Sequence, residues 1–166
     1  MDPEEWLRRK AGGYSTFEAA EKAAIQHFTF LWSIYENRLL GGHAFPKTIC
    51  KKVDQDIASD ILNPADFREA LHYFATRYVD ASGQLNTHYF DLRLRPEDGE
   101  ELVKNVLLGR TRDFSDVVFG LLLIVYRLRN NLFHGNKWDY GLIGQQQNFE
   151  NANDILMACM DRQSLF

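Results

Sequence analysis

Hydrophobic residues recur every three or four positions through the first part of the chain, which is the spacing of one face of an α-helix. Ser15, with Glu18 three residues later, has the pattern of a capping box, so we expect a long helix to begin there. Gly41 and Gly42 end this helix. Its apolar stripe consists of Phe17, Ala20, Ala24, Phe28, Leu31, Tyr35 and Leu39.

Similar stripes, separated by proline, asparagine or glycine, predict the later helices. Pro46 suits the first turn of the second helix, and Asn63 can cap the third. Asp113 is expected to cap the most apolar helix of the chain. Residues 84–95 lack a clear period and are expected to form a loop, as are the glutamines at 145–147. The helices predicted after the first cover residues 46–62, 65–80, 96–108, 114–134 and 149–163.

These elements predict an all-α fold, a single helical bundle of about five helices in one domain that spans residues 1–166. An apolar fraction of 45% suits a continuous core. The 12 Phe, 7 Tyr and 3 Trp are too many large apolar side chains for a disordered protein. The chain should therefore fold by itself or as an oligomer.

Charge and cysteine content narrow the classes of function. The net charge of -4 gives no global attraction to nucleic acid, so RNA would have to bind a local basic patch. Cys50 and Cys159 form no Cys-x-x-Cys pair, which indicates neither a disulfide framework nor a zinc knuckle. The acidic start lacks a signal-peptide pattern, and the longest apolar run, Val117–Tyr126, has about half the length of a membrane span. We expect a cytoplasmic protein without membrane contact.

The most apolar helix changes character within one turn after Tyr126. It continues as Arg127-Leu-Arg-Asn-Asn-Leu-Phe-His134, and Gly135 follows. Its apolar part has no polar face, so neighbours must cover it on all sides. We expect a second copy of the chain to provide part of this cover in a homodimer.

The stretch from Arg129 to Gly135 resembles the Arg-x-x-x-x-His signature of HEPN domains. Its position, after a strongly apolar helix and before one last helix, is also similar to that family. The resemblance implies a helical bundle that dimerises so that the two Arg-His motifs face a shared cleft and cut RNA without a metal ion. The aromatic helix that opens many HEPN domains is similar to the first helix here, with Phe28, Trp32, Tyr35 and Glu36.

In the toxin branch of HEPN proteins, the resemblance also implies an antitoxin protein as a partner. In that branch a tyrosine two residues after the motif histidine is the modified residue. Asn136 occupies this position here, and the next tyrosine is Tyr140, so the chain departs from that form of regulation.

The two motif residues suit RNA cleavage by their own chemistry. The imidazole of His134 can take a proton from a ribose 2′-hydroxyl or return one to the leaving 5′-oxygen near neutral pH. Arg129 can bind the phosphate as its charge grows in the transition state. The expected products are a 2′,3′-cyclic phosphate and a 5′-hydroxyl. The sequence contains neither metal-ligand spacing nor a nucleotide-binding glycine motif, so we expect no metal and no cofactor.

Helix geometry limits how the motif residues can meet. Arg129 and His134 would point about 140° apart on a regular helix. Either the helix loosens at Asn130 and Asn131, or each of two subunits contributes one of the two side chains. Asn130 shares a face with His134, so it can orient the imidazole or the phosphate.

Two further supporting residues, and the motif itself, have more than one explanation. Glu36 either supports the site or flanks the core, and Arg127 either contacts the RNA backbone or forms a salt bridge. The alternative for His134 is a favourable cation at a helix end that Gly135 terminates. The alternative to an endoribonuclease is therefore a non-catalytic RNA-binding, nucleotide-binding or dimerisation module.

Overall fold

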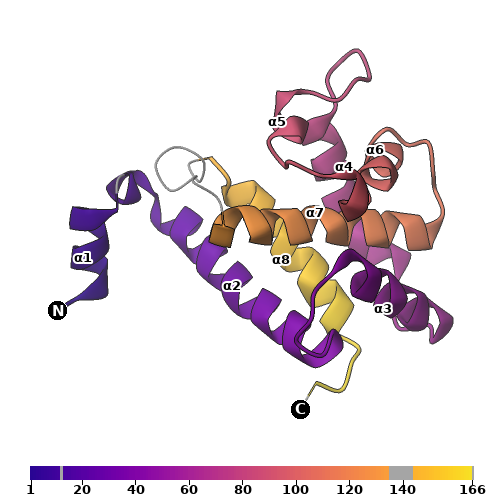
Figure 1. Ribbon diagram of the computed structural model, residues 1–166, viewed down its shortest axis with the longest axis horizontal. Helices are drawn as coiled ribbons and strands as arrows, with labels where there is room; N and C mark the ends of the chain where they lie inside the picture. The colour runs from indigo at the N-terminus through magenta and orange to yellow at the C-terminus, as the bar shows by residue number, and fades with distance from the viewer. Residues whose placement is uncertain (12, 135–143, 166) are drawn as a thin grey trace.

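The computed structural model is all-α, as the sequence predicts (Figure 1). It describes residues 1–11, 13–134 and 144–165, and for His134 the backbone only. In these ranges there are eight α-helices and no β-strand. An isolated antiparallel β-bridge joins Val79 and Leu85. The helices are α1 (Pro3–Lys10), α2 (Ala19–Leu39), α3 (Pro46–Ala58), α4 (Arg68–Tyr78), α5 (Thr87–Phe90), α6 (Glu100–Leu107), α7 (Phe114–His134) and α8 (Gln146–Met160). Short 3-10 helices are η1 (Tyr14–Thr16), η2 (Pro64–Phe67) and η3 (Pro96–Asp98).

Several helix starts lie where local sequence signals predict them. Pro46 is the first residue of α3. Asn63 accepts the backbone N–H of Ala65 at 3.1 Å, although it caps η2 rather than a full α-helix. Asp113 accepts two backbone N–H groups of the first turn of α7, at 2.9 and 3.3 Å. These starts are predictable because a side chain next to the helix supplies the missing hydrogen-bond acceptor.

Two other predicted starts are wrong. Ser15 lies within η1, and α2 begins only at Ala19. The last helix begins at Gln146 rather than at residue 149, so two of the three glutamines are helical. The cause is a distant carboxylate: Glu21 on α2 accepts the backbone N–H groups of Gly144 at 2.6 Å and Gln145 at 3.2 Å.

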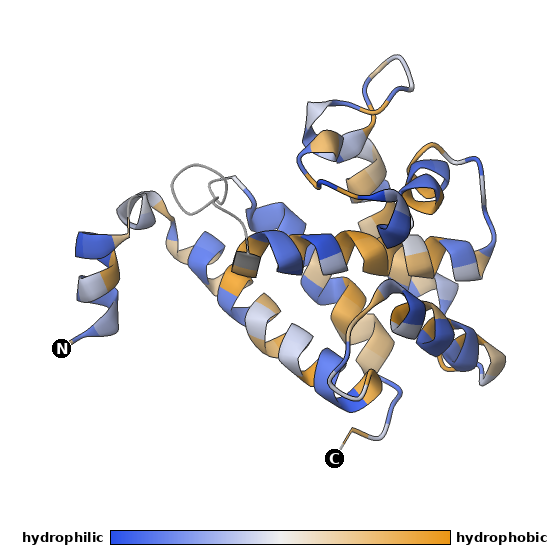
Figure 2. Cartoon of the chain, viewed as in Figure 1, coloured by the Kyte–Doolittle hydropathy of each residue, from blue (hydrophilic) through white to orange (hydrophobic). Residues whose placement is uncertain are grey.

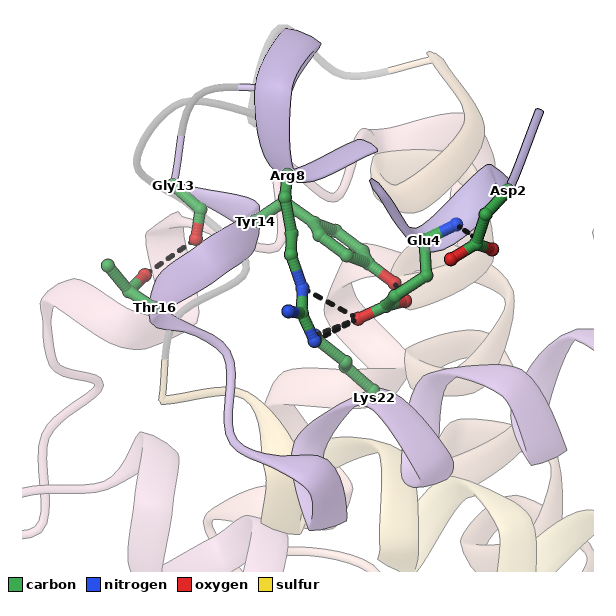
Figure 3. A network of polar contacts seen from close by, with 7 residues as sticks. All are labelled: Asp2, Glu4, Arg8, Gly13, Tyr14, Thr16 and Lys22. Carbon is green, nitrogen blue, oxygen red and sulfur yellow. Dashed lines mark hydrogen bonds and ion pairs between the residues drawn. The ribbon is translucent and has the colours of Figure 1, made fainter. Parts of the chain in front are cut away.

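The helix count exceeds the expected five partly because α1 forms before the first predicted helix. None of its residues is buried, and it projects from the end of the body formed by the other helices (Figure 1). Glu4 attaches it, with its carboxylate 2.8 Å from Nζ of Lys22 and 2.6 Å from the hydroxyl of Tyr14 (Figure 3). The hydrogen bond from Lys22 is the largest cause that lowers the pKa of Glu4 to about 2.

The predicted 84–95 loop contains a second additional helix, the single turn α5. Asn86 caps it by accepting the backbone N–H groups of His88 and Tyr89. The ring of Tyr89 is buried against Tyr78 of α4, with ring centroids 6.4 Å apart. The segment is therefore packed against the bundle rather than extended into solvent.

The middle of α7 forms the centre of the core. The residues from Leu121 to Val125 are at most 1% exposed, and α3, α6 and α8 pack around them (Figure 2). Helices α2 and α8 lie side by side and run in the same direction, and the rings of Phe28 and Phe149 lie 5.0 Å apart between them. The chain covers this part of α7 by itself, so its burial does not need the second copy that we expected to provide part of the cover.

Membrane insertion was not expected from the length of the apolar run. Within the described part of the chain, none of the helices combines the length and the apolar character of a membrane-spanning segment.

Candidate functional site

The Arg-x-x-x-x-His stretch forms the last turns of α7, where the helix leaves the core. Leu128 is still buried, whereas Arg129, Asn130 and Asn131 are partly exposed. The helix continues without interruption to His134, so it does not loosen at the asparagine pair. Of the two predicted ways for both motif side chains to reach one site, the contribution from two subunits is the one compatible with a regular α7.

Neighbours on two helices orient the guanidinium of Arg129. Its Nη2 lies 3.8 Å from Oε2 of Glu36 on α2, and its Nη1 donates to Oδ1 of Asn130 at 3.1 Å. Its Cζ lies 6.0 Å from the ring centroid of Trp32 and 5.4 Å from that of Phe133, which is within cation–π range. Because the side chain remains 26% exposed, the guanidinium is both oriented and accessible.

Glu36 joins three parts of the chain around this arginine. Besides facing Arg129, its Oε2 accepts the indole N–H of Trp32 at 2.8 Å. Its Oε1 accepts the backbone N–H of Ala44, in the loop between α2 and α3, at 3.4 Å. The sequence left the role of Glu36 open; the structure places it in contact with the motif arginine.

A cleft of about 590 Å³ opens beside Arg129. Its base is the polar end of α7, and its two sides are the loop between α2 and α3 and the loop that leads from α5 into η3. Among the described residues that line it, four arginines accompany two carboxylates, so the cleft is locally basic in an acidic protein. The charged lining residues are Glu36, Arg93, Arg95, Asp98, Arg127 and Arg129.

Arg127 serves the fold through a salt bridge, the simpler of its two predicted explanations. Its Nη1 lies 3.2 Å from Oδ2 of Asp98, and its Nε donates to the carbonyl of Leu92 at 3.1 Å. Asn131 donates to the same carbonyl at 3.3 Å. Both residues therefore attach the Arg93–Arg95 side of the cleft to α7, which is a positioning role rather than a direct one.

The sequence did not identify three cleft residues that the fold brings to Arg129. Arg93 and Arg95 come from the segment expected to be a loop, and His43 follows the two glycines that end the first predicted helix. Both segments connect helices, which does not predict a common cleft.

Parts of the sequence-based site lie outside the described residues. These are the side chain of His134, the helix-terminating Gly135 and the toxin-branch positions Asn136 and Tyr140. Among the described residues, no group of three or more histidine, cysteine, aspartate or glutamate side chains could hold a metal ion.

Comparison of the chain with protein-family models, with curated proteins and with solved structures found no match. The resemblance to HEPN domains consequently stays a prediction from the motif and the order of the helices.

Proposed function

We propose that this protein is a metal-independent endoribonuclease that cleaves RNA by attack of a ribose 2′-hydroxyl on the adjacent phosphate, with Arg129 and His134 as its catalytic residues. The observation that carries the proposal is the position of Arg129: an oriented, accessible guanidinium in a locally basic cleft, on the helix that ends at His134. An RNA strand is a ligand that matches such a cleft, because phosphate contacts dominate nucleic-acid affinity.

The role of Arg129 is to stabilise negative charge on the phosphate in the transition state. A guanidinium presents paired N–H donors that match two phosphate oxygens. The separation of 3.8 Å between Arg129 and Glu36 is long for a charge-assisted hydrogen bond, so this particular ion pair is not a tight one. Trp32 and Phe133 lie within cation–π distance of the guanidinium and help to hold its plane.

His134 would take a proton from the 2′-hydroxyl or return one to the leaving 5′-oxygen. Because α7 is regular to its end, positions 129 and 134 of one chain lie on different sides of the helix. A homodimer in which Arg129 of one subunit meets His134 of the other satisfies this geometry and forms two equivalent sites. Asn130, which bonds Arg129 and shares a helix face with His134, is suited to link the two motifs.

The test is incubation of the wild type, Arg129→Ala and His134→Ala with a mixed structured RNA in excess EDTA, followed by gel and end-group analysis. Arg112→Ala is the matched control, since Arg112 is an exposed arginine that does not line the cleft. Cleavage by the wild type and the control alone, leaving 2′,3′-cyclic phosphates, supports the proposal. Intact RNA in every sample, with RNA retained by the wild type in a binding assay, would replace it with the non-catalytic binding module.

A further inference from the structure

The proposed reaction requires two proton transfers on opposite sides of one phosphorus atom. The 2′-oxygen gives its proton to a base and forms a bond to phosphorus, while the bond from phosphorus to the 5′-oxygen breaks and that oxygen takes up a proton from an acid. The attacking and leaving oxygens lie roughly in line through phosphorus. A single imidazole held at one of them cannot also contact the other, so the site needs a second proton-transferring group.

The cleft beside Arg129 contains one candidate of the required chemistry. His43 is an exposed residue in the loop between α2 and α3 and lines the cleft. Histidine is the side chain that most readily exchanges protons near neutral pH. Arginines do not lose their protons in this range, and Asp98 is engaged by Arg127.

The loop that carries His43 is fixed by hydrogen bonds on both sides of this residue. The backbone N–H of Gly42 donates to the carbonyl of Glu36 at 2.9 Å, and the carbonyl of His43 accepts from the hydroxyl of Thr48 at 2.7 Å. Gly42 has a φ of 79°, a conformation that a residue with a Cβ rarely adopts. The backbone at His43 is therefore held in one position rather than free to move over the cleft.

Glu36 ties this loop to the arginine of the motif. One of its carboxylate oxygens accepts from Ala44, the residue after His43, and the other faces Arg129. A phosphate bound by Arg129 would thus lie in the cleft that His43 also lines. Because the Glu36 carboxylate contacts both Arg129 and the loop of His43, it would fix the distance between this loop and the phosphate. Glu36 is a positioning residue in this arrangement.

We propose that His43 is the general acid that protonates the leaving 5′-oxygen of the phosphodiester bound at Arg129, while His134 acts as the base. This inference rests on the proposed ribonuclease function and adds a residue to it. Proton donation leaves His43 neutral, and solvent returns the proton between turnovers. The charged groups that line the same cleft are Glu36, Arg93, Arg95, Asp98, Arg127 and Arg129.

A change of leaving group separates a general acid from a residue that only supports the structure. The wild-type cleavage position is first mapped on RNA, and the 5′-oxygen at that linkage is then replaced by sulfur. A thiolate leaves without protonation, because a thiol ionises near pH 8.5 and an alcohol only far above it. His43→Ala and His43→Asn are compared on both substrates, with the exposed His72→Ala of α4 as control and circular dichroism as the check on folding.

We expect both His43 variants to cleave ordinary RNA about a hundredfold or more slowly than the wild type, the range of general acid catalysis, and the sulfur substrate within a few-fold of it. Equal loss on both substrates, or no loss, would overturn the role of His43 and leave the ribonuclease proposal intact. Rescue by sulfur in His134→Ala instead would reassign the acid to His134. A wild type that cuts neither substrate would overturn both proposals together.

Discussion

Replacing Arg127 by methionine should destabilise the fold without removing a group that contacts RNA directly. The side chains of Arg127 and Asp98 are only 11% and 12% exposed, and their Nη1–Oδ2 distance is 3.2 Å. The Nε of Arg127 also donates to the carbonyl of Leu92 at 3.1 Å. Methionine keeps much of the volume but leaves a buried carboxylate and a carbonyl without these donors.

The expected loss is about 3 kcal/mol in the free energy of unfolding. Removing one partner of a buried ion pair costs about 3–5 kcal/mol, and the residual exposure of both side chains places this pair at the lower end. Adding Asp98→Leu should recover much of that loss, because replacing both charged partners with apolar groups is often close to neutral. A loss of about 3 kcal/mol is a large part of the roughly 5–15 kcal/mol that stabilises a typical domain.

Urea unfolding followed by circular dichroism measures these differences for the wild type, Arg127→Met, Asp98→Leu, the double variant and Arg112→Met. Arg112 is exposed, and its variant should stay within about 0.5 kcal/mol of the wild type. The reasoning fails if Arg127→Met unfolds like the wild type, or if the double variant loses the sum of the two single losses. Unchanged stability combined with weaker RNA binding would assign Arg127 to the RNA instead.

Three other contacts give predictions of the same kind. Glu21→Ala should cost about 1.5–3 kcal/mol in urea unfolding, because the carboxylate accepts two backbone N–H groups at the start of α8; an unchanged midpoint would contradict this. Gly120→Ala should cost about 1 kcal/mol of unfolding free energy, since the new Cβ would lie 2.9 Å from Cγ2 of Val106 and the strain exceeds the gain in helix propensity. In a background of Val106→Ala this cost should disappear. If the losses of the two substitutions simply add, the close contact is not the cause. Because the pKa of Glu4 is lowered to about 2, the stabilisation from its contact with Lys22 is fully present above the ordinary pKa of 4.5 and is lost as the pH falls toward 2. In Lys22→Met, an NMR titration should find the pKa of Glu4 closer to 4.5. An unmoved pKa would refute the assignment.

The parts of the fold that the sequence predicts well are those specified by neighbouring residues. Asp113 caps α7 within its own first turn, and Pro46 begins α3, so both starts are visible in a few consecutive positions. The start of α8 is different, because the carboxylate that binds the two residues just before it is Glu21, more than a hundred residues away along the chain. No periodicity or capping pattern around residues 145–149 contains that information.

The candidate site divides in the same way. The motif identified Arg129, and the helical pattern of the first helix brought Glu36 to attention. Neither predicts that the loop after α2 and the loop after α5 line one cleft at this arginine, because that depends on how α2 and η3 pack against α7. His43 and Arg93 were therefore outside the reach of a sequence argument.

The way in which α7 is buried also restricts where on this helix a partner subunit could bind. Its middle is enclosed by helices of the same chain, whereas the ring of Phe133 near its end is 50% exposed and lies over the guanidinium of Arg129. A second subunit that supplied a histidine to this arginine would thus have to approach the polar end of the helix and not its apolar middle. The lining of the cleft adds Phe45, 57% exposed, beside that end. The interface required by a composite site would then consist mainly of aromatic rings and arginines around the cleft, the same groups that would bind an RNA strand, so dimerisation and substrate binding would depend on one surface.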